Sequence, residues 1–170
     1  MEDGTLSGEI TAELSDYFTN MDEAINILGL QESDERKFFS DSSVVYRKDN
    51  FKLELMKEVY LDTEYVDYMI DNQNPTIAMF GVKCGQNVNQ ALETLKQYAS
   101  TYMFSEYDKD VNTKGKSMLV CYRGEIYSMW IDYHSEQNIV TGWGLSTYFE
   151  LNLDSSIFEQ LKKEDAARYE

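Results

Sequence analysis

Apolar positions along the chain follow two different periods, one typical of helices and one typical of strands. Apolar residues at helical spacing occur in 21–28 and again in 88–95. Asn20 and Asn87 stand directly before these stripes, where an asparagine side chain can accept a hydrogen bond from a backbone N–H of the first turn. The pattern predicts capped amphipathic helices at 20–28 and 87–99.

Other segments are rich in β-branched and aromatic residues, which favours strands. Strands are predicted at 44–47, 51–57, 64–71, 76–83, 102–107, 117–123, 125–133 and 138–147. A further helix is predicted at 9–18. The C-terminal segment also reads as a helix, because Ser156 and Glu159 can form a capping box at its start.

The first half of the chain matches the second half in order. NMDEAINIL at 20–28 aligns with NVNQALETL at 87–95, and shorter matches follow downstream in the same sequence. Matches in a constant order indicate a duplication. We therefore predict an α+β fold of two tandem helix-plus-antiparallel-sheet units at 1–83 and 84–150, followed by a C-terminal helix at 151–170, within one structural domain.

Turns placed at 73–74, 123–124 and 134–137 assign the strand residues to two sheet faces. Both faces are apolar, and the helices are expected to cover one of them. The second face carries both tryptophans, and an uncovered apolar face usually marks a binding site. The alternative is that the faces are interchanged, or that the C-terminal helix covers the second face. The predicted partner-binding residues are Met69, Phe80, Trp130, Asp132, His134 and Trp143.

Charge restricts the classes of partner. The chain has 15 basic and 31 acidic residues, a formal charge of −16. Such a surface repels phosphate backbones and anionic lipid, so nucleic acid is not an expected partner. The acidic surface is interpreted first as a solvated coat that keeps the protein soluble, and alternatively as a surface that attracts a basic partner. The sequence contains no run of ~20 apolar residues that would predict a membrane span. Its acidic start does not resemble a signal peptide, so either the protein is cytosolic or a signal or lipid anchor would lie upstream of this sequence.

Motifs for catalysis or metal binding are incomplete. The segment from Asp108 begins like a calcium loop, but Thr113 and Leu119 occupy the positions that require Gly and Glu. His134 is the single histidine, and it lies beside a predicted turn without a recognisable nucleophile. We therefore expect no catalytic residue, no metal and no cofactor, and the chain is not predicted to be an enzyme.

Several segments together give the chain a family resemblance. The helix ending AINILG, the antiparallel strands after it, and IAMFGVKCGQNVNQALETL, in which a strand leads into the next helix, carry this likeness. Over about 10–148, the chain resembles tandem-repeat modules like beta-lactamase inhibitory protein and the related small lipoprotein domains of Gram-positive bacteria. The resemblance implies a curved antiparallel sheet, helices on its convex side, a concave face that grips a protein, and no enzyme activity.

The expected function is therefore a noncatalytic, inhibitor-like module that binds an unidentified protein outside the cell or at its surface. The alternative is a cytoplasmic acidic decoy or immunity-type protein that imitates nucleic acid. Binding by a decoy should weaken steeply with salt, unlike a contact anchored by tryptophan. Cys84 and Cys121 are expected as buried free thiols, or as one disulfide if the protein is exported.

Overall fold

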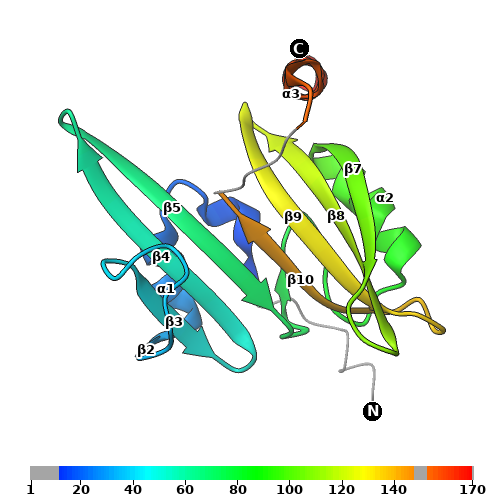
Figure 1. Ribbon diagram of the computed structural model, residues 1–170, viewed down its shortest axis with the longest axis horizontal. Helices are drawn as coiled ribbons and strands as arrows, with labels where there is room; N and C mark the ends of the chain where they lie inside the picture. Colours follow the sequence, from blue (N-terminus) through cyan, green and yellow to red (C-terminus); the bar gives the residue numbers. More distant parts are fainter. Residues whose placement is uncertain (1–11, 148–152, 170) are drawn as a thin grey trace.

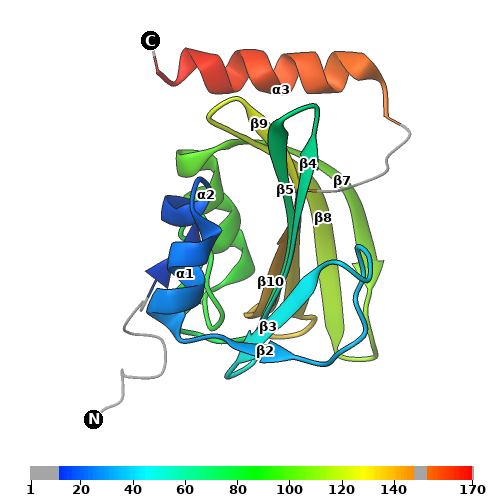
Figure 2. The ribbon, with the colours of Figure 1, turned by 90° about the vertical axis from the view of Figure 1, so that its left-hand side faces the viewer.

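An eight-stranded antiparallel sheet dominates the computed structural model, which describes residues 12–147 and 153–169. Helices α1 (Met21–Leu28) and α2 (Val88–Tyr98) lie on one face of this sheet, and α3 (Ser155–Ala167) crosses one end of it (Figures 1 and 2). We call the face beneath α1 and α2 the helix face and the opposite one the outer face. The predicted α+β class is confirmed.

The strands of the large sheet follow the order β2-β3-β4-β5-β10-β9-β8-β7. Their bounds are β2 (Gln31–Ser33), β3 (Val44–Lys48), β4 (Phe51–Tyr60), β5 (Thr63–Asn72), β7 (Ser100–Asp108), β8 (Thr113–Tyr122), β9 (Glu125–His134) and β10 (Val140–Ser146). Two short strands, β1 (Ala12–Glu13) and β6 (Ile77–Ala78), pair in parallel outside it. A short 3-10 helix, η2 (Leu14–Tyr17), follows β1.

Both predicted helix caps are confirmed. The Asn20 side chain accepts a hydrogen bond from the backbone N–H of Glu23 at 3.2 Å. The Asn87 side chain accepts one from the backbone N–H of Asn89 at 2.9 Å. Such caps satisfy backbone donors that the first turn of a helix leaves unpaired, so these short helices begin where local sequence directs them.

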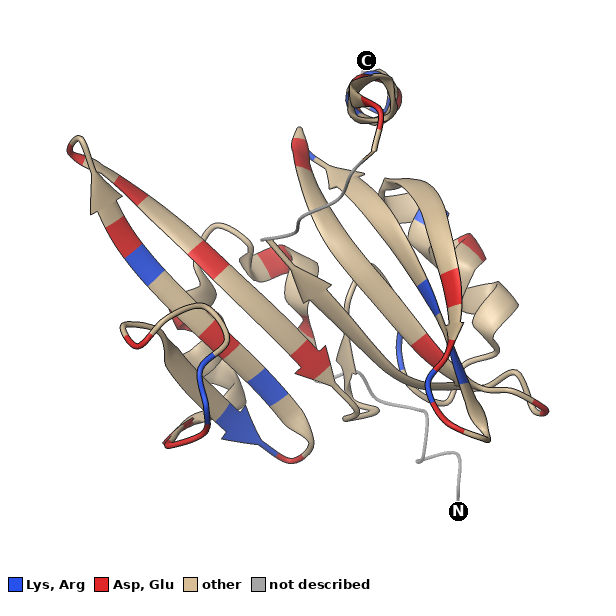
Figure 3. Ribbon diagram, viewed as in Figure 1, with Lys and Arg blue, Asp and Glu red and all other residues tan. Residues whose placement is uncertain are grey.

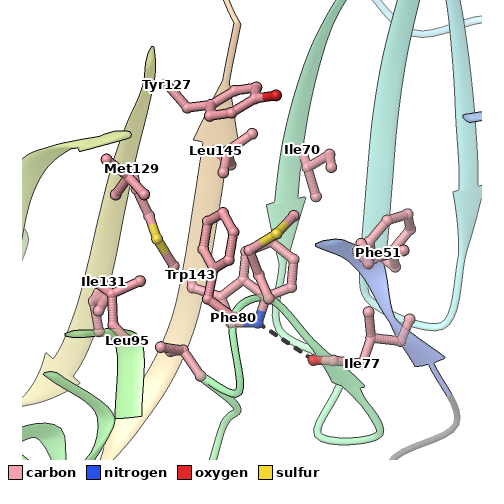
Figure 4. Close-up of a cluster of buried hydrophobic side chains, with 14 of the residues drawn as sticks. Phe51, Ile70, Ile77, Phe80, Leu95, Tyr127, Met129, Ile131, Trp143 and Leu145 are labelled. Atoms are coloured by element: carbon pink, nitrogen blue, oxygen red, sulfur yellow. Dashed lines mark hydrogen bonds between the residues drawn. The ribbon is translucent and has the colours of Figure 1, made fainter. Parts of the chain in front are cut away.

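The main core lies between the helix face and the helices (Figure 4). Side chains from β4, β5, β8, β9 and β10 meet α1 and α2 there, and Phe51, Ile70, Met129 and Trp143 are almost completely buried. Each such side chain contributes about 1.5–3 kcal/mol through removal of apolar surface from water. Burial of this face therefore fixes which side of each strand points away from the helices.

The strand predicted at 76–83 is wrong. Only Ile77–Ala78 are in strand conformation, and a turn with positive φ at Phe80 (54°) and Gly81 (76°) follows. The Glu13 carboxylate accepts hydrogen bonds from the backbone N–H groups of Phe80 (2.8 Å) and Gly81 (2.6 Å). Because Glu13 comes from a distant part of the chain, local periodicity contains no sign of this turn.

Two further predictions need correction near the N-terminus. The helix predicted at 9–18 lies partly outside the described residues, and its described part forms β1 and the 3-10 helix η2. The edge strand β2 was not predicted, because its sequence Gln-Glu-Ser is entirely polar. The remaining predicted helices and strands are present, with small differences in their bounds.

The predicted register of β10 is also wrong. The pairing of β10 with β9 shifts between Val140 and Gly142, which leaves Thr141 as an extra residue. A bulge of this kind reverses the faces of all the residues that follow it. Trp143 therefore lies opposite Ile131 and points towards the helix face.

Helix α3 covers a smaller apolar cluster on the outer face. Leu161 of α3 packs with Leu119 and Cys121 of β8, and partly buried side chains surround these three residues. The α3 Asp165 carboxylate accepts hydrogen bonds from the backbone N–H groups of Arg123 (3.3 Å) and Gly124 (2.7 Å) in the β8–β9 turn. A buried carboxylate thus attaches the helix to the sheet.

A second polar contact fixes the end of α3. The Arg168 guanidinium donates hydrogen bonds to the carbonyl oxygens of Lys96 (2.6 Å) and Ala99 (2.8 Å). These carbonyls lie at the C-terminus of α2, where a cation is favoured by the helix dipole. The two contacts join α3 to both layers of the fold.

Both cysteines are free thiols, so the alternative of a disulfide is not supported. The Cys84 thiol donates to the Thr141 carbonyl oxygen at 3.5 Å, whereas Cys121 lies beneath α3. Burial raises the pKa of each thiol to about 11. Thiolate is the reactive form, so both cysteines should react slowly at neutral pH.

Asp165→Asn should raise the alkylation rate of Cys121 at least tenfold while leaving Cys84 unchanged. An asparagine keeps one acceptor but places an NH₂ group near the backbone N–H donors of the turn, which weakens the attachment of α3. Iodoacetamide labelling followed by peptide mass spectrometry measures both rates in one sample. If Cys84 accelerates equally, the substitution unfolds the whole domain, and the proposed local role of Asp165 is wrong.

Candidate functional site

The structure separates the six predicted partner-binding residues into two groups. The outer face carries Met69, Trp130, Asp132 and His134. Phe80 and Trp143 are fully buried in the main core, so their predicted place on the uncovered face is wrong. The turn after Ile77–Ala78 redirects Phe80, and the bulge at Thr141 redirects Trp143. The Trp143 indole N–H donates to the Ile77 carbonyl oxygen (3.3 Å, Figure 4).

Part of the outer face is covered near β3 and β4. The Glu54 carboxylate, on the outer side of β4, accepts hydrogen bonds from the backbone N–H groups of Phe38 (2.8 Å) and Phe39 (2.6 Å). It also accepts one from the Ser43 hydroxyl at 2.6 Å. These bonds hold the segment 34–43 in front of the sheet (Figure 1). The outer face between this segment and α3 consists mainly of β5, β10 and β9.

Two glycines of β10 shape this central area. Gly144 pairs with Asp71 on one side and with Trp130 on the other. A Cβ atom added to Gly144 would lie 1.9 Å from the Trp130 indole, so the ring packs directly against the strand backbone. Gly142 likewise leaves the outer side of β10 without a side chain. The glycine spacing in Gly142-Trp143-Gly144 was a signal for this close packing that sequence reasoning did not use.

Asp132 and His134 hold the local structure. Asp132 is buried, and its carboxylate accepts hydrogen bonds from the Tyr107 hydroxyl and the Lys109 ammonium, both at 2.8 Å. Burial and the bond to Asp132 raise the pKa of Tyr107. His134 Nδ1 accepts a hydrogen bond from the backbone N–H of Gln137 at 3.1 Å. Because these groups are occupied, neither side chain is a good candidate for a direct contact with a partner.

The β4–β5 hairpin carries a group of exposed apolar side chains that sequence reasoning missed. We define the hairpin tip as residues 58–66. Of the eleven exposed large hydrophobic residues in the described part of the chain, five lie in this tip: Val59, Tyr60, Leu61, Tyr65 and Val66. The pairing of β10 with β5 ends at Met69, so the tip extends beyond this central pairing (Figure 1).

Acidic residues surround the apolar groups of the hairpin (Figure 3). Glu58, Asp62 and Glu64 lie within the tip, which contains no lysine or arginine. Lys57 directly precedes the tip and pairs with Asp22 of α1. The outer side of β5 carries Tyr65, Asp67, Met69 and Asp71. We define the outer strip as these four residues together with Trp130 of β9, which pairs with Gly144 of β10.

No protein-family model, curated protein or solved structure matches the chain. The resemblance to the beta-lactamase inhibitory protein type therefore stays a prediction. Among the described residues, no group of three or more His, Cys, Asp or Glu side chains is arranged to hold a metal ion. Within the same residues, each helix is too short or too polar to cross a membrane.

Proposed function

We propose that the chain is a noncatalytic protein-binding module whose partner contacts the hairpin tip and the outer strip. The concentration of exposed apolar side chains at the tip carries this proposal. A cluster of exposed apolar side chains on a folded domain often marks an interaction site, and tyrosine and tryptophan are enriched among the residues that dominate binding energy. Tyr60, Tyr65 and Trp130 are the aromatic side chains of this surface.

The partner is proposed to be basic. The carboxylates of the hairpin tip and outer strip interleave with the apolar side chains, and the whole chain carries a formal charge of −16. An acidic rim around an apolar centre favours a partner with lysine or arginine around its own apolar patch. The same charge disfavours a second copy of this chain as the occupant.

The family resemblance adds a setting to the proposal. We propose a secreted or surface-anchored protein that acts in an inhibitor-like way, as the resemblance implies. Under this proposal the partner is held chiefly by apolar contacts, with charge as a secondary contribution. The cytoplasmic decoy would depend mainly on its distributed carboxylates, and the apolar hairpin tip argues against it.

The duplication is proposed in a modified form. The sheet order supports a correspondence of α1-β2-β3-β4-β5 with α2-β7-β8-β9-β10, because β5 and β10 then pair antiparallel at its centre. Asn20 still corresponds to Asn87 in this alignment, whereas the turn at Phe80 has no counterpart in β10. An approximate two-fold axis perpendicular to the sheet would relate the two units.

A photo-crosslinking amino acid at Tyr65 should capture the proposed partner from an extract of the native cells. A crosslinker at Tyr98, an exposed aromatic position on α2, is the matched control. A protein captured at position 65 and absent at position 98 identifies the partner for purification. Equal capture at both positions would contradict the proposed surface.

Trp130→Ala should weaken binding of that purified partner by about 2 kcal/mol, or roughly 30-fold in Kd, because interface tryptophans are frequent anchors. Calorimetric titration at two salt concentrations measures the loss. An unchanged Kd would remove Trp130 from the interface. A steep loss of affinity of the unsubstituted protein with salt would favour the decoy.

A further inference from the structure

A pocket of about 300 Å³ lies between η2 and the end of the β8–β9 hairpin. Strands β5 and β9 both pair antiparallel with β10, so they run in the same direction and their preceding turns lie at the same end of the sheet. The pocket therefore lies at the end of the sheet from which the hairpin tip projects. It is lined by Ser15, Asp16, Phe18, Thr19, Tyr122, Arg123, Glu125 and Tyr127.

Aromatic rings form the apolar wall of the pocket. Phe18 stacks on Tyr127 with ring centroids 4.8 Å apart, and meets Tyr122 edge to face at 5.7 Å. This arrangement fixes the three rings against one another. A rigid aromatic wall suits an alkyl stem or a flat cationic group, which gain from ring contact without ordering a flexible side chain.

The charged groups of the pocket are predominantly negative. Asp16 and Glu125 are exposed, and neither has an ion-pair partner within 4.0 Å among the described residues. The single cation in the lining, Arg123, places its guanidinium over the Tyr122 ring at 5.2 Å from the centroid. Both carboxylates are therefore able to accept hydrogen bonds from a ligand.

A buried hydroxyl lies behind the same wall. Tyr68 is 3% exposed, its ring stacks on Phe18 at 6.1 Å, and its hydroxyl has no hydrogen-bond partner among the described residues. Burial raises the pKa of Tyr68, and the neighbouring Tyr127 and Glu125 raise it further. The Tyr68 ring thus packs behind the aromatic wall, and Tyr68 is not itself a lining residue of the pocket.

We propose that this pocket binds an organic cation, a primary ammonium or guanidinium group carried on a short apolar stem. The stem contacts Phe18 and Tyr127, and the cation donates hydrogen bonds to Asp16 and Glu125. The aromatic wall favours an organic cation over a metal ion, and two carboxylates against one guanidinium disfavour an anion. The volume is at the lower end for small-molecule sites, which restricts the ligand to a small amine or to one lysine or arginine side chain.

The test is a titration of isotope-labelled protein followed by amide chemical shifts. Hexylammonium represents a free amine, a blocked Ala-Lys-Ala peptide represents a protein side chain, and 1-hexanol is the neutral match. We expect saturable shifts confined to 15–19 and 122–127 with at least one of the cations and none with hexanol. Tighter binding of the peptide would identify a protein side chain as the source, and tighter binding of hexylammonium a free amine.

Matched charge removals complete the test. The double variant Asp16→Asn, Glu125→Gln should lower the cation affinity at least tenfold. Glu93→Gln, Glu136→Gln removes the same charge from α2 and the β9–β10 loop and should leave affinity within twofold. All four positions are exposed, so both variants should retain the native spectrum. Equal losses in the two variants, scattered shifts, or binding of hexanol would overturn the proposal, whether or not a protein partner binds the hairpin tip.

Discussion

Trp143→Ala should lower the free energy of unfolding by about 3–5 kcal/mol, the usual cost of truncating a large buried aromatic side chain. Trp143 is completely buried, and its indole N–H bonds the Ile77 carbonyl oxygen, which would also lose its partner. The side chain meets Phe80, Leu95 and other core groups where β10 faces α2 (Figure 4). Urea denaturation followed by circular dichroism measures the change.

Trp130→Ala is the matched control, since it removes the same side chain from the adjacent strand β9. Trp130 is only half-buried on the outer face, so its loss should cost less than half as much stability. An equal or larger loss for Trp130 would mean that the bulge at Thr141 is misplaced and that the two faces are interchanged. The pair of variants thus tests the register of β10.

Glu54→Gln should lower the free energy of unfolding by about 2–4 kcal/mol. Glu54 is almost fully buried and accepts three hydrogen bonds from Phe38, Phe39 and Ser43. A glutamine has one acceptor oxygen, so its NH₂ group faces a donor, and buried donors without partners cost about 1–3 kcal/mol each. Thermal and urea unfolding at neutral pH measure the loss.

Glu58→Gln provides the comparison on the same strand and the same face. Glu58 is exposed and should change stability by no more than about 0.5 kcal/mol. Glu54→Gln should in addition make the segment 34–43 more sensitive to limited proteolysis. If both variants behave alike, the carboxylate of Glu54 does not hold this segment to the sheet.

Local signals in the sequence predicted much of the fold. The helices at Asn20 and Asn87 were found because a cap and an apolar stripe need only neighbouring residues. The β8–β9 hairpin was also found, since the Arg123-Gly124 turn and the alternation on both sides fix its register. These features depend on contacts within a few positions along the chain.

Features set by distant contacts were not predictable in this way. The bulge at Thr141 could not be recognised from the local pattern, because both faces of the predicted sheet are apolar and Trp143 and Leu145 suit either one. The turn at Phe80 depends on Glu13, at a separation of 67 positions. The single extra residue at Thr141 was enough to place a core tryptophan on the proposed binding surface.

The candidate site also contains some features that local sequence predicts and others that depend on distant contacts. Met69 and Trp130 were correctly assigned to the outer face, because β5 and β9 are regular strands without bulges. The hairpin tip was missed because its alternation continues unchanged from the part of β4 that is buried. Only the point where β10 stops pairing with β5, at Met69, decides which of those apolar residues remain exposed.

The short pairing between β5 and β10 has a mechanical consequence. Four residue pairs join these strands, whereas each of the hairpins β4–β5 and β8–β9 contains ten. The sheet thus resembles two stiff plates connected along a narrow seam, and slow bending should concentrate there. A partner in contact with both Met69 and Trp130 would span the seam and fix the angle between the plates. One adjustable angle would then let a single set of side chains fit partners of different curvature.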